Sequence, residues 1–196
     1  MPSSRFSELE ARIVALRKFL LPDPFDPTGS YPNAEEVGVK ALGFRVLAHA
    51  ELEAYLEDRV LEVVSLAWNQ WVTFRKTSLP ALCLLAFSDR EMKKPPITFL
   101  PDDPSKKKGW PEKTDIGAKL DICVADFNKW IRNENHGVRE KNLTRMLISI
   151  GIDPSCVDSS LIAALDSFGQ TRGVAAHTSS AMQVKAGVDP ANELSS

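Results

Sequence analysis

The pair Arg172 and His177 is the first candidate for chemistry in this sequence. A guanidinium can hold a phosphate and offset the negative charge that grows on it during reaction. An imidazole ordinarily titrates near neutral pH and can therefore give or take a proton. These two groups together supply what the cleavage of RNA by its own 2′-hydroxyl requires, without a metal ion.

The spacing of this pair carries little weight alone, because two other arginines also closely precede a histidine. Arg45 and His49, and likewise Arg132 and His136, are four residues apart, against five for Arg172 and His177. A half-buried helix residue is the plain alternative for His177. Whether the pair is catalytic therefore depends on the elements that position it and on the sequence around it.

The bulk composition predicts one domain over residues 1–196, because 43% hydrophobic content is enough for a core. A net charge of −2 provides no global basic field, so any RNA-binding surface must be local. The three cysteines are scattered, which favours neither a disulfide framework nor a zinc site. We expect no cofactor, no metal and no membrane span, and a cytoplasmic protein.

Apolar residues recur at helical spacing over most of the chain, which predicts an all-α fold. The expected helices cover residues 6–21, 34–76, 80–87, 114–133, 140–150 and 158–177, the last with a bend at Gly169. Ser7 with Glu10 resembles a capping box for the first. Residues 34–76 contain no proline and form one long helix, or two with a kink near Gly43. A long helix needs partners along its length, which favours an up-and-down bundle with a core over about 35–180.

Three segments interrupt the helical pattern. Residues 21–33 contain four prolines, and residues 89–113 contain five prolines with the lysine run Lys106–Lys108. Proline lacks a backbone donor and fixes φ, so both segments are expected to be loops, the second mobile and rich in lysine. Residues 179–196 are polar without periodicity and are expected to form a flexible tail.

Four separated blocks resemble, in order, the RiboL-PSP-type branch of the HEPN superfamily. They are residues 49–57 (HAELEAYLE), 135–143 (NHGVREKNL), 165–169 (LDSFG) and the Arg172–Gly173 and Ala176–Ser179 pieces of the last block. The resemblance covers about residues 37–180. It implies a helical bundle with a long central helix that pairs as a two-fold dimer, and metal-independent endoribonuclease activity in a toxin–antitoxin or phage-defence system. The family motif, an arginine, four to six residues and a histidine, matches Arg172 and His177. Active members often carry Asn, Asp or His directly after the arginine, where this chain has Gly173.

Helix geometry gives a separate reason to expect a dimer. Residues five apart on an α-helix point about 140° away from each other. Arg172 and His177 of one chain therefore do not easily grip one phosphate, whereas two chains related by a two-fold axis can combine them in one cleft.

Weaker candidates surround this pair. Asn135, Lys141 and Asn142 belong to a polar stretch, with His136, Arg139 and Arg145, that can follow an RNA backbone; a capping turn and a solvated helix face explain it equally well. Thr178 can orient the histidine or the RNA, or simply end a helix. Glu51, with Glu53 and Glu57, can orient the catalytic pair, or form an exposed acidic face.

The sequence therefore predicts an endoribonuclease that forms a 2′,3′-cyclic phosphate, with RNA, a second copy of the chain and a cognate antitoxin protein as partners, and no membrane. A catalytically inactive HEPN-like module that binds RNA or protein is the alternative. A target for nucleotidylation by an antitoxin enzyme is a third hypothesis.

Overall fold

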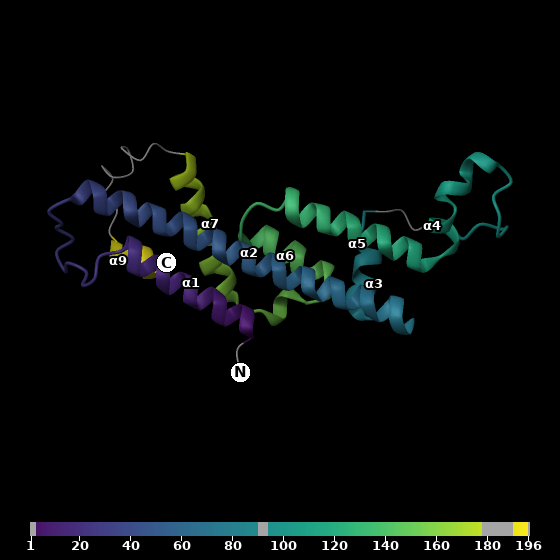
Figure 1. Cartoon of the computed structure of the whole chain (residues 1–196), viewed down its shortest axis with the longest axis horizontal. Coiled ribbons are helices and arrows are strands. Elements are labelled where there is room, and N and C mark those ends of the chain that lie inside the picture. Colours follow the sequence, from purple (N-terminus) through teal and green to yellow (C-terminus); the bar gives the residue numbers. More distant parts are fainter. Residues whose placement is uncertain (1–2, 90–93, 178–189, 196) are drawn as a thin grey trace. The chain divides into compact units, whose positions relative to one another are not determined.

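The computed structural model describes residues 3–89, 94–177 and 190–195, and within these ranges every regular element is helical (Figure 1). The all-α class predicted from the sequence is confirmed. The α-helices are α1 (Ser4–Leu20), α2 (Ala34–Phe74), α3 (Leu79–Ala86), α4 (Pro111–Thr114), α5 (Ile116–Asn133), α6 (Glu140–Ser149), α7 (Ser159–His177) and α9 (Pro190–Ser195). Two 3₁₀ turns are also present: η1 (Pro104–Gly109) lies between α3 and α4, and η2 (Pro154–Cys156) lies between α6 and α7. Across the described helices, none combines the length and the apolar character that crossing a membrane requires.

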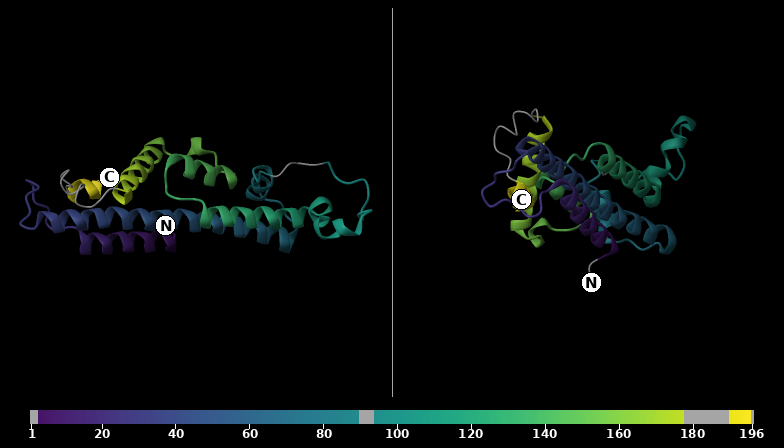
Figure 2. Two further views of the ribbon diagram at one scale, coloured as in Figure 1. Left: turned by 90° about the horizontal axis from the view of Figure 1, so that it is seen from above. Right: turned by 60° about the vertical axis from the view of Figure 1, so that its left-hand side comes forward.

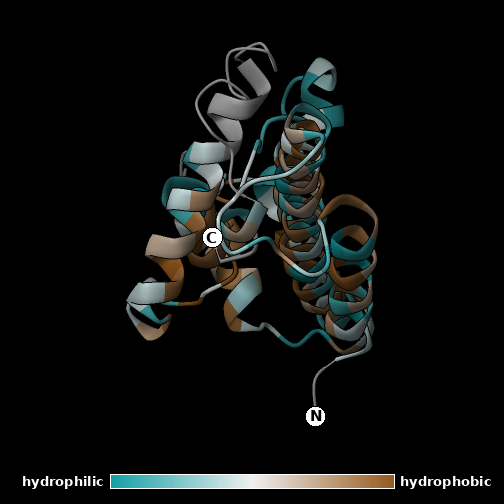
Figure 3. Cartoon of the chain, turned by 90° about the vertical axis from the view of Figure 1, so that its left-hand side faces the viewer, coloured by the Kyte–Doolittle hydropathy of each residue, from teal (hydrophilic) through white to brown (hydrophobic). Residues whose placement is uncertain are grey.

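The long helix α2 is a single element of 41 residues and passes through Gly43 without interruption. At 1.5 Å per residue it is about 60 Å long. No proline interrupts it, and apolar residues recur between polar ones along it (Figure 3). The sequence left open one long helix or two helices with a kink near Gly43, and the single helix is correct.

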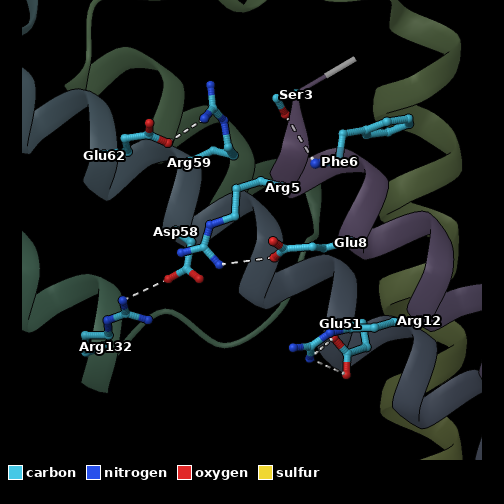
Figure 4. A network of polar contacts seen from close by, with 10 residues as sticks. All are labelled: Ser3, Arg5, Phe6, Glu8, Arg12, Glu51, Asp58, Arg59, Glu62 and Arg132. Carbon is cyan, nitrogen blue, oxygen red and sulfur yellow. Dashed lines mark hydrogen bonds and ion pairs between the residues drawn. The ribbon is translucent and has the colours of Figure 1, made fainter. Parts of the chain in front are cut away.

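The start of α1 differs from the sequence prediction. Ser3 is the N-cap, and its hydroxyl oxygen accepts a hydrogen bond from the Phe6 amide at 3.2 Å (Figure 4). The Ser7 amide already donates to the Ser3 carbonyl at 3.1 Å, so Ser7 lies inside the helix and is not its cap. A serine hydroxyl satisfies one of the amides left free at a helix start, which is why the helix begins here.

Contacts divide the chain into two compact units, which are described separately. The first contains residues 1–56, 137–143 and 157–196, and the second contains residues 57–136 and 144–156. Both α2 and α6 contribute residues to each unit.

In the first unit, α1 lies antiparallel beside the first part of α2 (Figures 1 and 2). Ala41, Phe44 and Ala48 of α2 are buried there, and the side chains packed against them include Ile13, Leu16 and Leu20 of α1 and Phe168 of α7. Arg12 also pairs with Glu51 at 2.9 Å (Figure 4). The apolar stripe on α1 thus finds its partner along the length of α2.

The helix α9 belongs to the same unit and was not expected from the sequence. Glu193 is only 5% exposed, and Arg45 Nε of α2 donates to its Oε2 at 2.5 Å. The expected flexible tail is therefore helical over Pro190–Ser195, whereas residues 178–189 lie outside the described part of the chain. A buried ion pair between distant segments leaves no periodic signal in a short polar stretch.

In the second unit, α5 lies antiparallel to the later part of α2. Arg132 pairs with Asp58 at 2.9 Å (Figure 4), and Trp68 Nε1 donates to Asp121 at 2.6 Å. The buried face of α5 follows the helical period that the sequence predicted, with Leu120, Cys123, Phe127, Trp130 and Ile131. The helix α3 packs against α5.

The segment expected to be a mobile loop contains regular structure. Residues 94–115, which we call the arm, include η1 and α4, which pack against each other, and α4 packs against α5. Asp103 caps η1 by accepting from the Ser105 amide at 2.9 Å. Two of the five prolines that suggested a loop, Pro104 and Pro111, stand at the first positions of η1 and α4. Proline is tolerated there because an amide N–H at that position would have no partner within the helix.

Candidate functional site

The two residues of the sequence motif lie in one helix. The backbone of α7 is helical to His177, so Arg172 and His177 both occupy its last turns. Their side chains, and the whole of Thr178, lie outside the described residues. Because no break separates the two positions, the helical offset of about 140° around the axis applies to them.

Phe168 lies one turn before Arg172 on α7 and ties this helix to α2. Its ring centroid is 5.5 Å from that of His49, and the two planes are tilted by 36°. His49 is 1% exposed and is therefore part of the interior. No local pattern pairs these two rings, because they come from segments more than a hundred residues apart.

A polar cluster continues from His49 to the turn before α6. His49 Nδ1 lies 3.5 Å from Glu53 Oε2, one helical turn later on α2. The other oxygen of Glu53 accepts a hydrogen bond from the Gly137 amide. The Gly137 carbonyl in turn accepts from Asn142 Nδ2 at 3.1 Å. The turn is thereby held from both sides, by a carboxylate and by an amide.

Gly137 adopts the unusual backbone conformation on which this turn depends. Its φ is +110°, a conformation that residues with a side chain rarely adopt. A Cβ at this position would lie 3.6 Å from His49 Cε1, which is ordinary contact. The backbone conformation, rather than lack of space, therefore makes glycine the suitable residue.

Asp166 of α7 joins the same turn from the other side. Its Oδ1 accepts from the Glu140 amide and from Arg139 Nε, each at 3.2 Å, and its Oδ2 accepts from Gln170 Nε2 at 2.5 Å. The hydrogen bond from the Glu140 amide, followed by those from Gln170 and Arg139, lowers the pKa of Asp166 below its usual value. Asp166 is thus a stable anion that holds the start of α6.

Gly169 completes the contact between α7 and the turn. It is buried, and a Cβ there would lie 2.7 Å from Arg139 Cγ and 3.5 Å from the Arg139 amide nitrogen. The aliphatic part of Arg139 therefore rests directly on the α7 backbone, because this position lacks a side chain.

Three segments of the first unit that are far apart in sequence thus meet one turn before the motif arginine. They are residues 49–53 of α2, residues 137–142 and residues 166–170 of α7. All three belong to the blocks that carry the HEPN resemblance. Asn142 and Glu53 are candidates from the sequence, but no pattern in it joins His49, Asp166 and Phe168 into one cluster.

The other supporting residues of this unit have separate positions. Glu51 accepts two hydrogen bonds from Arg12 of α1, at 2.9 and 3.2 Å (Figure 4), so its described partner is a cation of α1. Lys141 is exposed on the first turn of α6. Asn142 is half-buried and, as described, supports the Gly137 turn.

In the second unit, the predicted polar stretch includes Asn135, which is buried, and Arg145, which is exposed. Asn135 is 5% exposed, and its Nδ2 donates to Glu57 Oε1 at 2.7 Å, so it supports the fold there. Arg145 lies over the Trp130 ring, 4.1 Å from its centroid, beside a cavity of about 80 Å³. The two asparagines, Asn135 and Asn142, thus support the fold, whereas the basic side chains of Arg139, Lys141 and Arg145 are exposed.

Within the part of the chain that the structure describes, no three His, Cys, Asp or Glu side chains are grouped to hold a metal ion. The chain matches no protein-family model, no curated protein and no solved structure. The resemblance to the HEPN superfamily therefore rests on the residues of the sequence.

Proposed function

We propose that this protein is a HEPN-like, metal-independent endoribonuclease of a toxin–antitoxin or phage-defence system, and that its active site is composite across a homodimer. The observation that carries the proposal is the meeting of His49, Gly137 and Phe168 in one cluster directly before Arg172 on α7. Segments that resemble one family in order, and that also pack together, are better support than the short arginine–histidine motif alone.

The proposed reaction is attack by the RNA 2′-hydroxyl oxygen on the adjacent phosphorus. His177 takes the hydroxyl proton as general base or gives a proton to the leaving 5′-oxygen as general acid. Arg172 holds the phosphate and offsets the charge that develops on its oxygens. A new P–O2′ bond forms and the P–O5′ bond breaks, which leaves a 2′,3′-cyclic phosphate and a 5′-hydroxyl.

The cluster supports this chemistry by positioning α7. His49 contacts Phe168 of α7, and Glu53 fastens the Gly137 turn to α2. Asp166 and Gly169 of α7 contact Arg139, two residues after Gly137. A catalytic group must be held within a fraction of an ångström of its productive place, which a rigid supporting helix achieves better than a loop.

The direct test is incubation of the purified chain with a mixed RNA pool in EDTA, followed by analysis of the end groups. We expect cleavage with 2′,3′-cyclic phosphate ends, and no cleavage of DNA, which lacks the attacking hydroxyl. Loss of cleavage in EDTA with recovery in magnesium would remove the proposed mechanism.

Single substitutions test the two motif residues. General acid–base and charge-stabilising groups each contribute about 10² to 10⁴ in rate, so His177→Ala and Arg172→Ala should each lower the cleavage rate by that order. Thr171→Ala, on the same helix, is the control and should keep most activity. Circular dichroism should show all three variants folded.

The binding-module alternative predicts a different result for the same variants. If folded His177→Ala protein cut RNA at the parental rate, or if the parental chain bound RNA without cutting it, the enzyme proposal would be replaced by that of a non-catalytic HEPN-like module. Gly173, at the position where active relatives often carry a polar residue, is the feature that favours this alternative.

A further inference from the structure

The arm of the second unit presents apolar side chains to solvent. Ile97, Phe99 and Leu100 are 102%, 93% and 75% exposed, the first two being among the most exposed large apolar residues in the described chain. Single exposed apolar residues are common, but three within four positions are not explained by packing.

The backbone that carries these side chains is held by two hydrogen bonds. The Thr98 hydroxyl donates to the Leu100 carbonyl at 2.8 Å, and Trp110 Nε1 donates to the Phe99 carbonyl at 2.9 Å. Lys113 lies over the Trp110 ring, 5.1 Å from its centroid. The apolar segment 97–100 is therefore fastened to the C-terminal end of η1, beyond the start of α5 in Figure 1.

The same end of η1 carries three exposed lysines, Lys106, Lys107 and Lys108. The Trp110 amide donates to the Lys107 carbonyl at 3.3 Å, so the tryptophan that holds Phe99 also touches the lysine run. Lys108 is two residues from Trp110, a span of at most about 7 Å. The arm thus places a contiguous positive charge beside three apolar side chains.

The arm contains five lysines and four acidic residues, so its net charge is only +1, and the positive charge is local to the lysine run. Asp103 and Asp115 direct their carboxylates to the backbone amides of Ser105 and Gly117 as helix caps. Asp102 and Glu112 remain exposed in the arm. The lysine run itself contains no acidic residue.

We propose that the arm docks on an anionic lipid surface, with Ile97, Phe99 and Leu100 entering the apolar layer and Lys106–Lys108 contacting the headgroups. An anionic bilayer is negative at its face and apolar beneath it, which matches both features of the arm. Single-stranded RNA matches less well, because its bases stack on aromatic rings and two of the three apolar side chains are aliphatic.

This proposal differs from the sequence expectation that no membrane is involved. That expectation rested on the lack of a spanning segment, and a peripheral contact needs none. The inference is independent of the proposed ribonuclease activity, because it concerns residues 97–108 and can be measured without RNA.

The test is sedimentation of the full chain with vesicles of phosphatidylcholine mixed with phosphatidylserine, and with vesicles of phosphatidylcholine alone. We expect binding to the mixed vesicles, weaker binding at high salt, and little binding to the neutral ones. No binding to the mixed vesicles, or equal binding to both kinds, would overturn the proposal.

Variants locate the contact. Phe99→Ser should lower the partition coefficient about tenfold or more, and replacing Lys106, Lys107 and Lys108 by Ala together should lower it about a hundredfold. Phe19→Ser on α1, where the side chain is 76% exposed, is the matched control and should change it less than about twofold. Vesicle binding that survives Phe99→Ser, with RNA affinity lowered instead, would make the arm an RNA-binding element and refute lipid docking.

Discussion

Gly137 joins three parts of the cluster through its backbone. Its amide donates to Glu53, its carbonyl accepts from Asn142, and its Cα faces the His49 ring. These contacts require the backbone to turn through φ +110°. A small residue thus sets where α6 begins relative to α7, and the polar side chains around it follow from that turn.

Replacing this glycine tests how much the turn contributes. Gly137→Ala should lower the free energy of unfolding by about 1–3 kcal/mol, because alanine is strained at this φ. Urea unfolding followed by circular dichroism measures the change. Gly109→Ala, in η1, meets open space and has an ordinary φ, so it should stay within about 0.5 kcal/mol of the parent. Equal changes in the free energy of unfolding for the two variants would show that the turn does not need glycine at position 137.

The charge of Asp166 should make part of the stability pH-dependent. Its pKa is lowered from 3.8 in the folded protein, chiefly by the Glu140 amide, so its contribution is present above pH 3.8 and is lost as the pH falls through the lowered pKa. Asp166→Asn should therefore lower the melting temperature at pH 7, and the difference should shrink as the pH falls below 3.8. Asp102→Asn in the arm is the control. A difference that grew in acid would contradict this assignment.

At the scale of elements, α7 is the helix on which the proposed chemistry depends, and a glycine decides how it packs. Gly169 lies against Arg139 of the turn before α6, whereas a Cβ added at Gly43, within α2, would meet nothing within 4 Å. The two glycines therefore have different reasons to be tolerated inside a helix. Gly169 permits a close contact, and Gly43 only weakens a helix that α1 and α7 support.

Alanine at these two positions should act in opposite directions. Gly43→Ala should raise the free energy of unfolding by about 0.5–1 kcal/mol, because alanine favours the helix and meets no neighbour. Gly169→Ala has the same higher helix propensity, but its methyl group would press against Arg139 close to the backbone. The free energy of unfolding should therefore fall by about 1 kcal/mol. Thermal unfolding of both variants provides the comparison. Stabilisation by Gly169→Ala would mean that Arg139 moves aside freely.

At the scale of the whole molecule, the proposed composite site requires two chains. One helix carries both motif positions, about 140° apart around its axis, which disfavours a single phosphate held by both residues of one chain. In a two-fold dimer, the arginine of one chain can act together with the histidine of the other. Light scattering of the purified protein at micromolar concentration should give twice the mass of one chain.

Mixing two inactive variants tests where the partners come from. Arg172→Ala and His177→Ala are each expected to be inactive alone. If arginine and histidine of different chains act together, a mixture that forms heterodimers contains one intact pair and should regain a substantial fraction of the parental cleavage rate. A mixture that exchanges chains, shown by tagged copies, and stays inactive would mean that both groups act within one chain.

Local pattern alone determined most of the helices. The face of α5 could be predicted because residues three and four apart share one side of a helix, whatever they pack against. The stretch without proline predicted helix over residues 34–76, but it left open whether this was one helix or two with a kink near Gly43. The arginine–histidine spacing likewise needed only the sequence, because both residues fall on one helix.

Tertiary structure decided the rest, because the relevant partners are far apart along the chain. The contact of His49 with Phe168, the hydrogen bond of Gly137 to Glu53 and the ion pair that holds α9 to Arg45 join segments that no local pattern relates. Order in the arm depends in the same way on Trp110 reaching back to Phe99. Periodicity reports which face of a helix is apolar, but only packing determines which other segment covers that face.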